Sequence, residues 1–165
     1  MNQGELSFPF PPPVVAPASC GCRVRPSANQ NCSSGGSGLA VSFDTNDNDT
    51  NGFHSTTVNP TRITVPAGYG GLYLFVGQLE YQTGSAGIRE AYIRKNGVDT
   101  SSGWLGYNTM NPLQTTNTNR IQVVVLAWLS GGDYMELMAF QSSGGTLTID
   151  GGAQQTWFAC AFLGG

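Results

Sequence analysis

Apolar residues recur in the second half of the chain in short runs typical of β-strands. Residues 121–129 are an almost unbroken apolar run, which indicates a strand covered on both faces. After Ser130-Gly131-Gly132-Asp133, residues 134–140 alternate between two faces, with Glu136 as the single charge. The Gly-Gly-Asp sequence supplies the positive-φ positions of a tight turn. We therefore predict a hairpin, which the rest of the chain must cover because an isolated hairpin is marginal in water.

Several other segments have the character of strands. Residues 72–81 and 156–163 are apolar on both faces over much of their length. A two-layer sandwich needs only one apolar face per sheet, so these strands predict a further packed surface, which we expect to be a second copy of the chain. Residues 88–95 form another expected strand before Asn96-Gly97, a strong hairpin signal. No twelve-residue window has a helical period, so the predicted fold class is all-β. Shorter strands are expected at 39–44, 63–66 and 146–149.

The composition excludes several function classes. Only 10% of the 165 residues are charged, and the net charge is −3. Seven Lys and Arg residues spread along the chain make no phosphate-binding stripe, so no nucleic-acid partner is expected. No run reaches the ~20 apolar residues of a membrane span. The first residues lack the basic and apolar parts of a signal peptide, so we expect a soluble chain made in the cytosol.

The first 38 residues differ from the rest. They are rich in proline, which favours an extended course, and they end in a Gly/Ser-rich linker at 33–38. We divide the chain into an extended N-terminal arm and linker, 1–38, and one domain, 39–165. The plain alternative is a disordered tail, but the arm carries more apolar residues than a solvated tail usually does. We expect the arm to dock onto another subunit or partner through Leu6, Phe8, Phe10, Val14 and Val15.

The four cysteines are expected to be free thiols. Cys20, Cys22 and Cys32 fall in the polar arm, whereas Cys160 lies in an apolar strand. Disulfides are rare in a reducing compartment. The three arm cysteines could instead be metal ligands, although no well-placed fourth ligand follows them.

A weak calcium candidate lies in the Asp/Asn-rich segment 44–52. Asp47, Asp49 and Asn51 fall at positions 1, 3 and 5 of an EF-hand-like loop. Val58 occupies position 12, where such a loop needs a bidentate Glu. An Asx-rich turn that satisfies its own backbone is therefore the preferred interpretation, and no cofactor is expected.

Catalytic machinery is not visible in the sequence. His54 is the single histidine, and a lone histidine after a turn is most often a structural hydrogen-bonding group. No paired carboxylates, nucleophile elbow or phosphate loop appears. We expect a protein that is not an enzyme.

A series of short motifs between residues 39 and 165 resembles the tumour-necrosis-factor-like jelly roll. The closest form is that of the complement globular heads, as found in many bacteriophage virion proteins. The resemblance rests on the order and spacing of the motifs together. They are Phe43-Asp44, Asp49-Thr50-Asn51-Gly52-Phe53-His54, Asn59-Pro60-Thr61-Arg62-Ile63-Thr64-Val65-Pro66, Gly71-Leu72-Tyr73, Arg89 with Asn96-Gly97, Gly132-Asp133-Tyr134 with Glu136-Leu137, and Phe162-Leu163-Gly164.

The resemblance implies a ten-strand antiparallel sandwich that forms a homotrimer. Its threefold contact would use the face that carries Tyr73 and Phe75 or the face that carries Trp157 and Ala159. The implied function is a bacteriophage virion structural protein, a trimeric capsid decoration or cement protein whose arm attaches to the major capsid protein or another virion protein. Such a protein is assembled in the bacterial host cytoplasm. The alternative is the tip of a tail fibre or spike that binds the host cell surface through the loop-rich segment 101–119.

Overall fold

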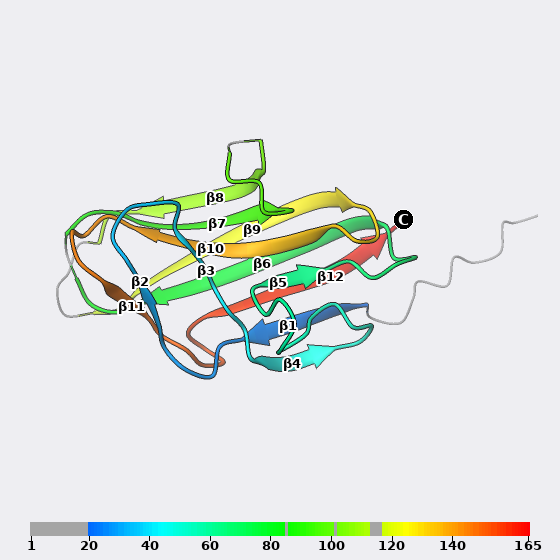
Figure 1. Cartoon of the computed structure of the whole chain (residues 1–165), viewed down its shortest axis with the longest axis horizontal. Coiled ribbons are helices and arrows are strands. Elements are labelled where there is room, and N and C mark those ends of the chain that lie inside the picture. Colours follow the sequence, from blue (N-terminus) through cyan, green and yellow to red (C-terminus); the bar gives the residue numbers. More distant parts are fainter. Residues whose placement is uncertain (1–19, 85, 101, 113–116) are drawn as a thin grey trace, which may run out of the picture.

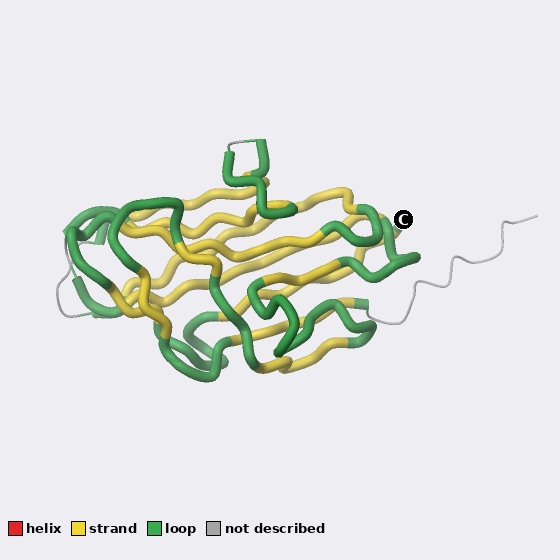
Figure 2. Tube along the Cα trace, in the orientation of Figure 1, coloured by secondary structure: helices red, strands yellow, loops and turns green. Residues whose placement is uncertain are grey.

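Strands and loops, without a helix, make up the part of the chain that the structure describes (Figures 1 and 2). The structure is a computed structural model, and it describes residues 20–84, 86–100, 102–112 and 117–165. None of these residues belongs to a helix of the length and apolar character that crossing a membrane requires. The strands are β1 (Gly21–Arg25), β2 (Gln30–Cys32), β3 (Leu39–Ala40), β4 (Thr45–Asp49), β5 (Arg62–Thr64), β6 (Gly71–Tyr81), β7 (Arg89–Lys95), β8 (Trp104–Met110), β9 (Asn119–Leu129), β10 (Tyr134–Gln141), β11 (Leu147–Ile149) and β12 (Trp157–Gly164).

Two antiparallel sheets face each other in a sandwich, which confirms the all-β prediction. The first sheet has the order β2-β11-β6-β12-β1-β4, with β9 also paired to β6. The second sheet has the order β3-β10-β7-β8, with β5 also paired to β10. The described residues thus form twelve strands, two more than the ten expected. The additional pieces are short: β3 has two residues, and β2, β5 and β11 have three each.

The core lies between the sheets and is rich in aromatic rings. Phe75 stands between Tyr73 and Phe158, with ring centroids 6.1 and 5.6 Å away. Phe43 stacks on Phe158 at 6.0 Å. These side chains are fully buried, and Tyr73, Phe75 and Phe158 all come from the first sheet, so aromatic rings form a large part of that sheet's inner face.

The expected hairpin of residues 121–140 is wrong. β9 pairs with β6 along eleven residues of the first sheet, whereas β10 pairs with β7 in the second. The turn between them crosses from one sheet to the other, with Gly132 at φ +92° and the Asp133 carboxylate accepting a hydrogen bond from the Ser130 amide. The local signal for a turn was correct, but long-range pairing decides which strands are partners. The Asn96-Gly97 turn does join paired strands, β7 and β8, through residues 96–103.

The sandwich begins before the expected boundary at residue 39. β1 pairs with β12 on one side and with β4 on the other, and its Cys22 and Val24 side chains enter the core. Arg23 and Arg25 point outward and bind Asp47 of β4. The alternation in β1 was masked by its small and charged residues, so the described residues from Cys20 onward belong to the sandwich. The arm residues Leu6, Phe8, Phe10, Val14 and Val15 lie outside the described residues.

Candidate functional site

An apolar surface on the outer side of the first sheet is the main candidate site. β9 alternates along its length, so that Ile121, Val123 and Val125 are buried between the sheets. The intervening Val124, Leu126 and Trp128 are 59, 62 and 68% exposed. The expectation that this strand is covered on both faces therefore fails within a single chain, because no described segment covers its outer side.

The neighbouring strands extend this surface. Residues that pair directly in an antiparallel sheet share one face. Leu72, Leu74 and Val76 of β6 lie opposite Trp128, Leu126 and Val124 of β9, and all three are half-buried. From β12, Ala159 and Ala161 lie opposite Val76 and Leu74, and Leu163 is 54% exposed. We call this set the apolar face: Leu72, Leu74, Val76, Val124, Leu126, Trp128, Ala159, Ala161 and Leu163.

One end of the same sheet surface is polar. Gln122 donates a hydrogen bond to Gln78 across β9 and β6, with Nε2 and Oε1 2.8 Å apart. Arg120 forms an ion pair with Glu80, whose side chain is only 6% exposed. The Gln78 amide also donates to the carbonyls of Gln154 and Gln155. The polar side chains at this end have hydrogen-bond or ion-pair partners within the chain, so the part of this surface that lacks partners among the described residues is the apolar face.

The structure distinguishes the two expected contact surfaces. Tyr73 and Phe75 are fully buried between the sheets, so the face that carries them serves the core and not a subunit contact. Trp157 and Ala159 are half-buried and lie on the outer side of β12. The Arg23 guanidinium covers the Trp157 ring at 4.9 Å. Sequence reasoning missed Val124, Leu126 and Trp128, although their alternate spacing in an otherwise apolar strand was the available signal.

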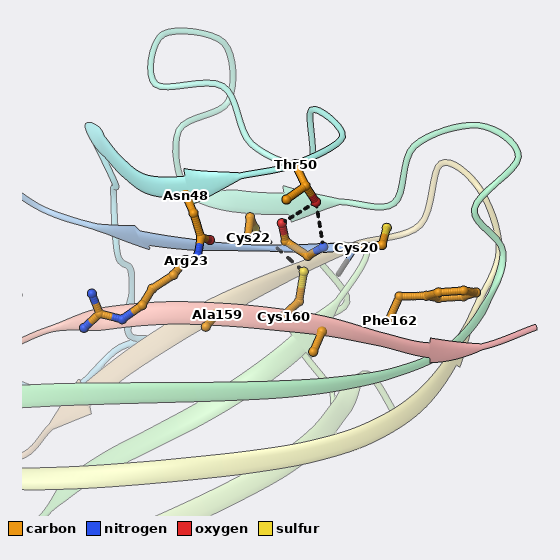
Figure 3. Close-up of a pocket in the computed structure, with 10 residues that line it drawn as sticks. Cys20, Cys22, Arg23, Asn48, Thr50, Ala159, Cys160 and Phe162 are labelled. Carbon is orange, nitrogen blue, oxygen red and sulfur yellow. Dashed lines mark hydrogen bonds between the residues drawn. The ribbon is translucent and has the colours of Figure 1, made fainter. Parts of the chain in front are cut away.

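Beside the apolar face, three cysteines border a hollow between β1 and β12 (Figure 3). Cys22 lies directly opposite Cys160, and their Sγ atoms are 3.7 Å apart. Hydrogen bonding to Cys160 and burial raise the pKa of the Cys22 thiol, and burial raises that of Cys20. All four cysteines are free thiols in the structure.

The suggested metal set of Cys20, Cys22 and Cys32 does not assemble. The Cys32 thiol lies 3.6 Å from the Ala139 carbonyl of β10, whereas Cys22 faces Cys160 of β12. Burial raises the pKa of Cys32 to about 11, which disfavours the thiolate that a metal requires. Over residues 20–84, 86–100, 102–112 and 117–165, no group of three His, Cys, Asp or Glu side chains is placed to hold a metal ion.

The acidic segment has structural partners. The Asp47 carboxylate binds two arginines of β1, and Asp49 accepts hydrogen bonds from the amides of Gly52, Phe53 and His54. These contacts match an Asx-type turn after Asp49, although residues 45–49 form strand β4 and not a loop. The calcium candidates Asp47, Asp49 and Asn51 therefore point to separate partners, with Asn51 donating to the Tyr69 hydroxyl.

His54 has the structural role expected of it. Its Nδ1 lies 2.7 Å from the Asn46 side-chain oxygen, and its Nε2 lies 3.1 Å from the Pro60 carbonyl. Burial lowers the pKa of His54 and so favours the neutral ring. The ring thus joins Asn46 of β4 to Pro60, shortly before β5.

No protein-family model matches the chain, and no curated protein sequence matches it. Among solved structures, the chain is similar to Eiger TNF from S. frugiperda, with a TM-score of 0.60 and 12% sequence identity. The match covers 88% of this chain and 93% of that chain. Identity at this level carries information about the fold alone. Together with the two antiparallel sheets, it shows that the chain folds as a tumour-necrosis-factor-like jelly roll.

Proposed function

We propose that this protein is a virion structural protein that works as a homotrimer, with its subunits joined through the apolar face. The observation that carries the proposal is the exposure of Val124, Leu126 and Trp128 side by side on β9. Contiguous apolar surface of this kind is unusual on a soluble monomer and marks a site of association. β9 pairs with β6 along eleven residues without a shift in register, so this part of the surface is ordered before association.

A second copy of the chain is the occupant that best fits the apolar face. The tumour-necrosis-factor-like resemblance implies a threefold assembly, and the outer side of β6, β9 and β12 supplies a flat contact of the required chemistry. The polar end, with Arg120 paired to Glu80, limits the apolar contact to one part of the sheet. The outer side of the second sheet lies on the opposite side of the sandwich from the apolar face.

Attachment to the particle is assigned to the N-terminal arm. Residues 1–19 precede β1, the strand that neighbours the cysteine hollow, and they contain the apolar residues Phe8 and Phe10. Proline-rich segments lose little conformational entropy when they dock into a groove. In this proposal, the arm binds the major capsid protein or another virion protein during assembly in the bacterial host cytoplasm. The proposal assigns the chain no catalytic step.

Three measurements test the proposal. Sedimentation equilibrium of the full chain should give three times the 17.4 kDa subunit mass, and antibody–gold labelling should mark the heads of the source particles. Deletion of residues 1–19 should leave the trimer intact and abolish particle binding. A monomeric parent chain would refute the assembly role, whereas binding by the deleted form would refute the role of the arm. Gold confined to a tail tip would replace the decoration role by the alternative, a receptor-binding tip.

A further inference from the structure

The outer side of the second sheet carries an exposed aromatic platform. Trp104 and Tyr107 of β8 are 37 and 50% exposed, and their rings are nearly parallel, 7° apart in plane with centroids at 6.3 Å. Tyr92 of β7 lies against the Trp104 ring at 4.6 Å and is almost completely buried. Tyr92 therefore supports the Trp104 ring, and Trp104 and Tyr107 both leave part of their side chains exposed to solvent.

Beside this platform lies a hollow of about 420 Å³, a volume within the usual range for small-molecule sites. Loop residues Gly36 and Ser37 form one wall. The remaining lining is Ile88, Glu90, Tyr92, Asp99, Trp104 and Phe140. Both apolar ring surface and carboxylate oxygens thus border one space.

The hollow is organised before any ligand arrives. The Tyr92 hydroxyl donates a hydrogen bond to the Ser37 carbonyl at 2.7 Å, which joins the loop wall to β7. The Tyr107 hydroxyl donates to Glu90 Oε1 at 2.6 Å, which fixes the carboxylate beside the platform. Such prior ordering lowers the entropy cost of binding.

The carboxylates retain free acceptor capacity. Within the described part of the chain, Glu90 Oε2 has no hydrogen-bond partner, and Asp99 contacts only Arg94, with 3.7 Å between Oδ1 and Nη1. Arg94 is also bound to Glu136, so it does not neutralise both carboxylates that line the hollow. The hollow consequently offers hydrogen-bond acceptors and a net negative charge beside aromatic rings.

We propose that this hollow binds a saccharide, in particular a neutral hexopyranose residue of a polysaccharide. One side of such a ring presents C–H groups, which stack on the electron-rich ring of Trp104 at the wall of the hollow. Its hydroxyl groups donate to the free oxygens of Glu90 and Asp99, as specificity in a pocket requires a few placed polar groups. Acidic sugars are disfavoured because their carboxylate would approach two others.

An organic cation is the competing ligand, because aromatic rings with carboxylates also bind ammonium groups. A cage of that kind needs ring faces that surround the cation. Here Tyr92 fills one face of Trp104 at 4.6 Å, and Tyr107 is parallel to Trp104, so the rings form a platform and not a cage. This geometry favours a flat partner.

The proposed sugar site does not depend on the proposed trimer. The hollow lies on the outer side of the second sheet, and the apolar face lies on the outer side of the first. None of the residues that line the hollow belongs to the apolar face. The site would serve adhesion to a surface polysaccharide in either a decoration protein or a fibre tip.

The test begins with the full-length protein on an array of neutral, amino and acidic oligosaccharides. Methyl glycosides of the neutral sugars that bind are then titrated by isothermal calorimetry, with choline and arginine as cation probes. Trp104→Ala should weaken binding about tenfold, the scale of one aromatic contact. Glu90→Gln should also weaken sugar binding, because the amide nitrogen that replaces one carboxylate oxygen cannot accept a hydrogen bond from a sugar hydroxyl. Leu105→Ala is the matched control, since Leu105 is a comparably exposed neighbour outside the hollow.

Outcomes separate clearly. Binding of neutral sugars that Trp104→Ala weakens about tenfold and Leu105→Ala leaves unchanged, with unchanged melting temperatures, supports the site. A preference for choline or arginine would replace the saccharide with a cation. No binding on the array, a preference for acidic sugars, or full binding by Trp104→Ala would overturn the proposal.

Discussion

Replacement of Trp128 by Asp is the sharpest probe of the apolar face. The side chain is 68% exposed in the single chain, so the substitution removes few contacts within the subunit. Covering the exposed part of a Trp side chain removes roughly 170 Å² from water, worth about 4 kcal/mol at ~25 cal/mol per Å². The new carboxylate would also be buried without a partner, which costs several kcal/mol more. Each subunit of the proposed trimer bears this loss.

The expected result is therefore a folded monomer. Sedimentation equilibrium should give the 17.4 kDa mass of one chain, while far-UV circular dichroism keeps its β-sheet spectrum. Val58→Asp is the matched control: Val58 is 66% exposed but lies between β4 and β5, away from the apolar face. The control should retain the mass of the parent protein.

A Trp128→Asp protein with the same oligomeric mass and the same dissociation concentration as the parent would refute the reasoning. A monomeric Val58→Asp protein would refute it as well, since the effect would then not belong to one face. Loss of the β-sheet spectrum in Trp128→Asp would contradict the placement of this side chain outside the core.

Three further predictions concern stability. Burial raises the pKa of Asp133, but hydrogen bonds, above all the one from Lys95, outweigh burial and hold the pKa at about 2. The resulting stabilisation is complete above the unfolded pKa of about 3.9 and is lost as the pH falls through 2. Asp133→Asn should therefore lower the free energy of unfolding by about 2 kcal/mol at pH 7 and reduce its dependence on acid pH in a series of urea unfolding curves. Oxidation by diamide, which accepts two electrons and two protons, should join Cys22 to Cys160 by a disulfide and raise the melting temperature, and the oxidation should be faster at alkaline pH. Mass spectrometry should find the loss of two hydrogens only when both cysteines are present. Arg89→Met should lower the free energy of unfolding by about 2–4 kcal/mol, because the buried guanidinium donates hydrogen bonds to the backbone carbonyls of Gly84, Ala86 and Ile88. An unchanged urea midpoint would contradict this role.

Local patterns predicted the strands better than their partners. The alternation in residues 134–140 and the apolar run at 121–129 both became strands, because side-chain period is a local property. Their assignment to one hairpin failed because β6 and β7 compete for them, and sequence spacing does not encode that choice. The same limit hid β1, whose inward Cys22 and Val24 alternate with Arg23 and Arg25, and these arginines meet their partner Asp47 only across the sheet.

The candidate sites show a similar division. The presence of a doubly apolar strand predicted that an outer surface exists, but not that Tyr73 and Phe75 face inward while Trp128 faces outward. Alternation along β6 shows which of its side chains share a face, but which face points into the core is known only once the register with β9 is known. The aromatic hollow was beyond reach for another reason: Ser37 and Trp104 lie far apart in sequence and meet only after the second sheet is complete.

The opposite placement of the two candidate surfaces has a consequence for binding strength. The proposed trimer would carry three hollows, and three weak sugar contacts on one polysaccharide gain strength through effective concentration. Trp128→Asp should then leave the calorimetric affinity for a single methyl glycoside unchanged and weaken attachment to the polysaccharide by about a hundredfold or more. Trp104→Ala should weaken both and leave the oligomeric mass unchanged. The two variants thus separate assembly from recognition, because each lies on one sheet and neither contributes to the core between them.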